Sequence, residues 1–166
     1  ASPRTMKLWI KFLLFLIPAV AGTIFVFWRF SPEQAIIKRA DVLFTSLEKK
    51  TLSSGTPKEK AARFQEILSP QLEIKAPFPI PSGKVPPATA AYHLKQFQGG
   101  VTSCKIARKD ETVAFPSEGM AIYQSTVVAD ISAGPNSQRV LRYRCRLEFE
   151  KSGRDWLLRS IVLTPI

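Results

Sequence analysis

Apolar and charged residues alternate along residues 139–150, RVLRYRCRLEFE. One phase of the alternation is apolar and holds Leu141, Tyr143, Cys145, Leu147 and Phe149. The other phase is charged and holds Arg142, Arg144, Arg146, Glu148 and Glu150. Because successive side chains of a strand point to opposite faces, this pattern predicts a long β-strand with one buried and one charged face. A helix would spread the arginines around its circumference and bury some of them.

Three segments have the apolar spacing of amphipathic helices. The first begins at Ser31-Pro32 and the second at Thr56-Pro57, where a capping residue precedes a proline suited to the first helical position. The third is PATAAYHLKQF, residues 87–97, and Gly99-Gly100 predicts its end. We expect Ser69-Pro70 to end the second helix and QLEIK to form a short strand after it.

A proline-rich stretch, APFPIPSGKVPP at residues 76–87, predicts an ordered irregular loop or a polyproline segment. After residue 100, alternating runs predict four strands at about 101–114, 118–133, 138–151 and 155–164. The connections between these runs are short, so we expect an antiparallel meander of neighbouring strands.

The N-terminal segment FLLFLIPAVAGTIFVFW, residues 12–28, contains no charged residue. With Leu8, Trp9 and Ile10 it is long enough for a membrane-spanning helix over residues 8–28, since about 20 helical residues cross a bilayer. Tryptophans near both ends suit the membrane interface, and spanning helices accommodate a proline. The expected anchor residues are Trp9, Phe12, Leu16, Pro18, Phe25 and Trp28.

A cleavable signal peptide is the alternative, because Ala19-Val20-Ala21 has the small-x-small form of a cleavage site. The chain stays apolar for seven residues after Ala21, which favours a retained anchor over residues 1–30. Basic residues are nearly balanced on the two sides of the segment. The short N-terminal tail is similar to that of a bacterial signal anchor, which predicts a domain on the periplasmic side.

The order helix, helix, short strand, helix and four long strands predicts an α+β domain over residues 31–166. This order resembles the nuclear transport factor 2-like (SnoaL-like, cone-fold) superfamily over about residues 32–164. Two segments carry the resemblance: SPEQAIIKRADVLFTSLEKK as first helix and GRDWLLRSIVLTPI as closing strand. It implies about three helices packed on a strongly curved, mainly antiparallel sheet. The fold hosts isomerases, dehydratases, hydrolases and binding proteins, so it does not define a function.

The chain carries a formal net charge of +11, with four basic and no acidic residues in its first 30 positions. Such an excess suits an anionic partner. Arg142, Arg144 and Arg146 form the candidate partner interface on the outer sheet face, with a solvated charged face as the alternative. Nucleic acid is disfavoured because the aromatic residues of this strand lie on the opposite phase. The resemblance implies that the outer face commonly serves as a partner or oligomer interface, so a homo-oligomer is one expectation.

Candidate chemistry is sparse. The cone enzymes of the resembled superfamily place a carboxylate, histidine or tyrosine inside the cone, and the weak cavity candidates here are Asp41, His93 and Tyr143. Asp130 is a further carboxylate without an evident partner. No metal-ligand spacing or phosphate-binding loop is present, so we expect no cofactor and no metal. Cys104 and Cys145 fit small core residues, with a disulfide or a reactive thiol as alternatives.

These observations favour a non-catalytic, single-pass membrane protein whose cone domain stabilises or assembles a larger membrane complex. A membrane-tethered SnoaL-like enzyme or carrier for a small hydrophobic ligand is the alternative. The combination of short tail, one span and cone domain also resembles the bitopic cone-domain component of type IV secretion machines. A deep pocket with convergent polar groups would favour the enzyme, and a filled cone would favour the accessory subunit.

Overall fold

The computed structural model describes residues 16–28, 31–50 and 55–166. The chain forms two compact units, Ala1–Ala35 and Ile36–Ile166. In the first unit, residues 16–28 are helical, and Leu16, Pro18, Phe25 and Trp28 are exposed on this helix. Trp9 and Phe12 lie outside the described residues. Among the helices of the described ranges, none combines the length and apolar character needed to cross a membrane.

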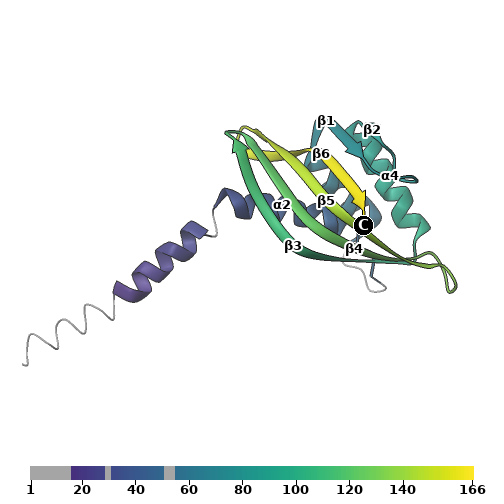
Figure 1. Cartoon of the computed structure of the whole chain (residues 1–166), viewed down its shortest axis with the longest axis horizontal. Coiled ribbons are helices and arrows are strands. Elements are labelled where there is room, and N and C mark those ends of the chain that lie inside the picture. The colour runs from purple at the N-terminus through teal and green to yellow at the C-terminus, as the bar shows by residue number, and fades with distance from the viewer. Residues whose placement is uncertain (1–15, 29–30, 51–54) are drawn as a thin grey trace, which may run out of the picture. The chain divides into compact units, whose positions relative to one another are not determined.

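The second unit is built on a six-stranded sheet in the order β2-β1-β6-β5-β4-β3 (Figure 1). Its strands are β1 (Leu68–Lys75), β2 (Gly83–Lys84), β3 (Ser103–Ser117), β4 (Met120–Ser132), β5 (Gln138–Ser152) and β6 (Asp155–Pro165). The pair β1–β6 is parallel and the other pairs are antiparallel, so the sheet is mixed. The four long strands β3 to β6 form the predicted meander.

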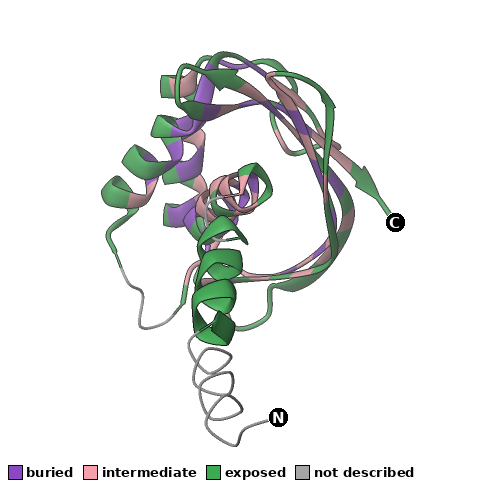
Figure 2. Cartoon of the chain, turned by 90° about the vertical axis from the view of Figure 1, so that its left-hand side faces the viewer, coloured by how far each residue is buried: buried purple, intermediate pink, exposed green. Residues whose placement is uncertain are grey.

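Three helices lie against the concave side of this curved sheet: α2 (Pro32–Leu47), α3 (Pro57–Glu66) and α4 (Pro87–Gly100) (Figure 2). The predicted helix starts are confirmed. The Ser31 hydroxyl accepts a hydrogen bond from the Gln34 N–H at 3.3 Å. Thr56 and Glu59 form a reciprocal capping box, which satisfies two N–H groups at the start of α3. The α+β architecture expected from the order of elements is therefore present.

The alternation along residues 139–150 is also confirmed. Cys145, Leu147 and Phe149 are buried on the concave face of β5, while Arg142, Arg144 and Arg146 are exposed on its convex face. The buried side of α2 packs in the same interior and holds Ile36, Ala40, Leu43 and Phe44. The charged and apolar phases of the strand thus separate solvent from core.

The region around Ser69-Pro70 differs from the prediction. Helix α3 ends at Glu66, and β1 begins at Leu68, which pairs with Leu158 of β6. A register shift between Leu68 and Glu73 accommodates Pro70 inside the strand, since proline has no N–H to donate. The short strand β2 was predicted as loop, and α4 continues through the two glycines expected to end it.

Long side chains fasten the C-terminal end of α2 to α4 and to β3. The buried Gln98 amide donates to the Ser46 and Leu47 carbonyls at 3.0 and 2.8 Å. In return, the Lys49 ammonium donates to two carbonyls at the end of α4, each at 2.7 Å. The Lys49 backbone also pairs with Cys104 at the edge of β3. These contacts place α2 across the concave face.

Candidate functional site

The interior of the second unit contains a cavity of about 520 Å³. Its walls come from the three helices, from β1, β5 and β6, and from the proline-rich loop. Except for His93, Gln96 and Cys145, the residues that line it are apolar. Cavities of about 300–1,000 Å³ with mainly apolar walls are typical of small-molecule sites.

The polar side of the cavity is formed by α4. His93 is half-buried there, and its ring lies 6.0 Å from the ring of Tyr92. The Gln96 amide donates a hydrogen bond to the Tyr92 hydroxyl at 2.8 Å. No carboxylate of the described residues lines this cavity. His93 therefore has no acidic partner within the cavity wall.

The two cysteines are buried, free thiols. Burial raises the pKa of Cys145, which lines the cavity, to about 12. Burial, together with the negative charge of Glu48, raises the pKa of Cys104 to about 11. Because the thiolate is the nucleophile, the raised pKa values lower the reactivity expected of both thiols near neutral pH.

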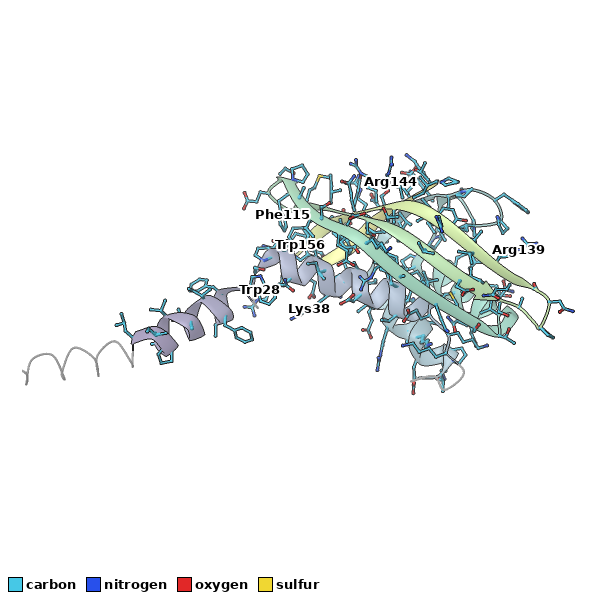
Figure 3. All side chains as sticks on the ribbon, turned by 60° about the horizontal axis from the view of Figure 1, so that its bottom comes forward. Trp28, Lys38, Phe115, Arg139, Arg144 and Trp156 are labelled. Carbon is cyan, nitrogen blue, oxygen red and sulfur yellow. The ribbon has the colours of Figure 1, made fainter. Side chains whose placement is uncertain are left out.

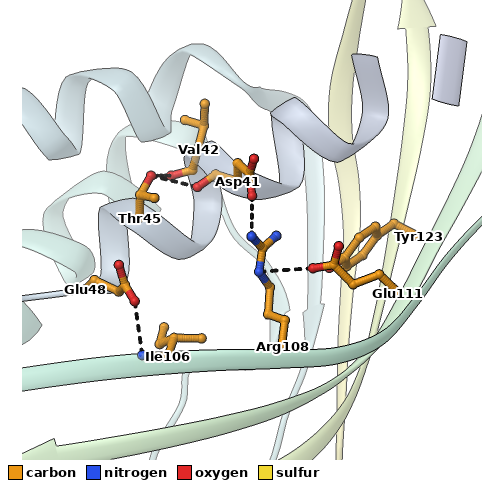
Figure 4. A network of polar contacts seen from close by, with 8 residues as sticks. All are labelled: Asp41, Val42, Thr45, Glu48, Ile106, Arg108, Glu111 and Tyr123. Carbon is orange, nitrogen blue, oxygen red and sulfur yellow. Dashed lines mark hydrogen bonds and ion pairs between the residues drawn. The ribbon is translucent and has the colours of Figure 1, made fainter. Parts of the chain in front are cut away.

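A charged network occupies another part of the concave side (Figure 4). Arg108 of β3 points inward, and its Nη2 forms an ion pair with Asp41 of α2. Its Nε lies 3.2 Å from the Glu111 carboxylate, which also accepts a hydrogen bond from the Tyr123 hydroxyl at 2.9 Å. The guanidinium lies over the Phe44 ring at 5.0 Å, a distance suited to a cation–π contact.

The network raises the pKa of Arg108, and the pKa of Tyr123 is raised as well. Burial acts to lower the pKa of Arg108, but the hydrogen bond and charge of Asp41 outweigh it, so the pKa is raised and the cation is retained. Burial raises the pKa of Tyr123 to about 12, and the hydrogen bond to Glu111 acts in the same direction. Tyr123 therefore remains a donor, and both carboxylates of the network are held by Arg108 or Tyr123.

The three predicted cavity candidates lie in different places. His93 lines the cavity, whereas Asp41 belongs to the Arg108 network. Tyr143 is half-buried on the concave face opposite Pro165, and the cavity reaches β5 only at Cys145. Asp130 lies on the convex face and accepts a hydrogen bond from Gln138 at 2.9 Å. The structure therefore brings no two of these groups together.

The convex face of the sheet carries Arg142, Arg144 and Arg146, the predicted partner interface, which form a row of arginines along β5 (the arginine row). Figure 3 shows Arg144 on the side of the sheet away from the helices. Arg146 pairs with Glu148 at 3.0 Å. Arg142 and Arg144 are exposed and have no ion-pair partner among the described residues. Lys109 extends the basic row, because it lies opposite Thr126, which in turn lies opposite Arg144.

Sequence reasoning missed Arg108. The signal was the phase of β3: Arg108 shares its period-2 register with Cys104 and Ile106, both of which face inward. A charged residue on an apolar phase indicates an internal ion pair, and Asp41 was available on the first helix of the domain.

Prediction: in a Cys104→Ser variant, Cys145 is the only thiol. Because its pKa is raised to about 12, the thiolate fraction should increase about tenfold per pH unit from pH 8 to 10, and iodoacetamide alkylation should accelerate accordingly. In urea, the rate should level off above about pH 8.5, the pKa of an ordinary thiol. Mass spectrometry gives both rates. A folded-state profile that levels off like the urea profile would contradict the buried placement.

The sequence matches no family model and no curated protein.

Several solved structures have a similar fold. A protein from Novosphingobium aromaticivorans DSM 12444, provisionally named a scytalone dehydratase, is 16% identical with a TM-score of 0.63, covering 80% of this chain and 83% of that one. A provisionally named dehydratase of the NTF2-like family from Streptomyces avermitilis is 9% identical with a TM-score of 0.62, covering 80% and 95%. An NTF2-like protein from Cytophaga hutchinsonii ATCC 33406 is 10% identical with a TM-score of 0.60, covering 80% and 97%. The expected NTF2-like fold is thus confirmed.

Proposed function

We propose that this chain is a non-catalytic accessory protein that binds other subunits of a membrane protein complex through its cone domain. The observation that carries the proposal is the convex sheet face, where Arg142 and Arg144 are exposed without an ion-pair partner among the described residues. A face with unpaired cations suits an acidic surface, because complementary charge accelerates association and excludes basic partners.

The interior supports a binding role rather than catalysis. General acid–base chemistry needs a titratable group within reach of the substrate, usually with a second group that orients it. Asp41 and Glu111 are held by Arg108, and no carboxylate of the described residues lines the cavity with His93. Two similar structures carry dehydratase names, but the described residues that line this cavity include no paired acid and base.

We further propose that the N-terminal segment anchors the protein in a membrane, with the cone domain on the periplasmic side. The supporting observation is the apolar sequence of residues 12–28. Within it, Ile17, Ile24 and Phe27 on the described helix are 63%, 64% and 76% exposed. Apolar side chains exposed all around a helix favour contact with lipid.

A carrier for a small hydrophobic ligand is the second candidate function. The cavity of about 520 Å³ favours it, because the cone is not filled by its own side chains. The nearly apolar wall would select an apolar ligand, and His93 with Gln96 would provide one polar contact.

Prediction: replacing Arg142, Arg144 and Arg146 together by serine should release the partner during mild-detergent purification of the tagged protein. The variant should still fold, since exposed charges contribute about 0–1 kcal/mol each. Partner binding by the unmodified protein should weaken with salt, because exposed charges are screened over about 8–10 Å. Mass spectrometry of the co-purified proteins measures the loss.

The matched control removes three other exposed cations, Lys38, Lys58 and Lys95, on the three helices of the domain. It lowers the net charge equally and should retain the partner. Equal partner recovery from both triple variants would leave the arginine row as a solvated face.

Prediction: the full chain should remain in the membrane pellet after carbonate and high-salt washes, whereas a peripheral protein held by charge is released. An Ile17→Lys, Val20→Lys variant places two cations near the centre of the apolar segment 8–28, where each costs about 2.5–3.5 kcal/mol in a spanning helix. Immunoblotting of pellet and supernatant should show more of this variant released. Release of the unmodified chain would contradict the anchor.

A further inference from the structure

Phe78 stands out among the apolar residues of the domain because its side chain is 96% exposed. It lies in the loop between β1 and β2, and that loop is held in a defined shape. The Ile80 N–H donates to the Pro77 carbonyl at 3.1 Å. The Ser82 hydroxyl donates to the Ala76 carbonyl at 2.8 Å and accepts from the Ala76 N–H at 3.2 Å, which closes the base of the loop.

Such a loop presents its aromatic ring at little entropic cost on binding. Pro77, Pro79 and Pro81 each fix one backbone angle, and Ser82 joins the two ends. A contact residue that is already ordered before association loses less conformational freedom when it is buried. Phe78 therefore has the properties of a preformed anchor residue.

The same loop forms part of the wall of the apolar cavity. Pro79, Ile80 and Pro81 line the cavity directly after Phe78. The polar residues that line this cavity are His93, Gln96 and Cys145, and none of its lining residues is a lysine, arginine or carboxylate. An exposed aromatic residue and an apolar cavity of about 520 Å³ therefore adjoin each other on one molecule.

We propose that two copies of this chain associate through the cavity side of the domain, each placing Phe78 in the cavity of the other. A two-fold contact is self-complementary, so it requires a projecting group and its receptor on the same patch. The cavity side of the domain provides both, because Phe78 is the projecting group and the adjoining cavity is its receptor. Like residues face each other near a two-fold axis, and the cavity lining contains no lysine, arginine or carboxylate that would meet its own copy there.

This interface is separate from the arginine row of β5 and leaves that row available to an acidic partner. A buried phenylalanine removes about 150–250 Å² from water and belongs to the aromatic class that dominates interface energetics. The inference does not depend on the accessory role, because it concerns only copies of this chain. A small apolar ligand in the cavity would compete with Phe78 for the same space.

Photocrosslinking tests the contact directly. In the full chain, Phe78 is replaced by the photoreactive analogue p-benzoylphenylalanine. This variant is purified in mild detergent and mixed with unmodified chain that carries ¹⁵N. The mixture is then irradiated. We expect a crosslinked dimer in which residue 78 of one chain is joined to a cavity-lining peptide of the other, such as residues 90–97. The isotope label distinguishes this product from a crosslink within one chain.

The control places the same analogue at Phe115, which is 44% exposed and lies beside Trp156, away from the cavity lining. It should give no crosslink to the cavity peptides of a second chain. Crosslinks from position 78 that stay within one chain, reach the convex face of the second chain or do not form would each overturn the proposal.

A stability-neutral variant provides the second measurement. Phe78→Ser should fold normally because the ring is 96% exposed, and it should raise the dimer dissociation constant about 30-fold or more, as expected for a dominant interface residue. Sedimentation in density-matched detergent measures that constant, with Phe115→Ser as the control variant. An unchanged constant for Phe78→Ser, or a monomeric unmodified chain at every concentration, would overturn the proposal. Binding of an apolar dye to a monomeric chain would instead support the carrier function.

Discussion

Arg108 places a guanidinium group inside a curved sheet, and the arrangement of the concave side depends on how that charge is neutralised. Asp41 reaches it from α2 and Glu111 from its own strand, while the Phe44 ring covers one of its faces. Arg108 is half-buried, so its pairing with Asp41 and its contact with Phe44 join the helix that carries both residues to the sheet. The contacts of Gln98 and Lys49 fix the other end of the same helix.

The same network accounts for two of the acidic side chains on the concave side of the domain. The Asp41 and Glu111 carboxylates compensate Arg108, burial raises the pKa of Tyr123 to about 12, and burial also raises the pKa of both thiols. What remains accessible is an apolar cavity with one histidine, a rigid loop that exposes Phe78, and a convex face with unpaired arginines. Each of these features suits binding, and none provides a paired acid and base.

The regular parts of this fold could be predicted from periodicity, because each strand of the meander has to separate a buried from a solvated face. The strand 139–150 is the clearest case, and the starts of α2 and α3 followed from Ser31 and Thr56 as caps. The extent of β1 could not be predicted, since it depends on pairing with β6, which lies far away in the sequence. The role of Arg108 also depends on a distant contact, although its phase within β3 was a usable local signal.

The most direct test of the Arg108 network is a double-mutant cycle with Arg108→Met and Asp41→Asn, measured by urea unfolding of the full chain. We expect a coupling free energy of about 1 kcal/mol, since the Arg108 side chain is 23% exposed and that of Asp41 is 45% exposed, which screens part of the interaction. The pair Arg39–Asp155 also joins α2 to the sheet, but its Asp155 side chain is 70% exposed, so the same cycle there should give a smaller value. A coupling near zero for Arg108 and Asp41, or one no larger than that of Arg39 and Asp155, would contradict the account.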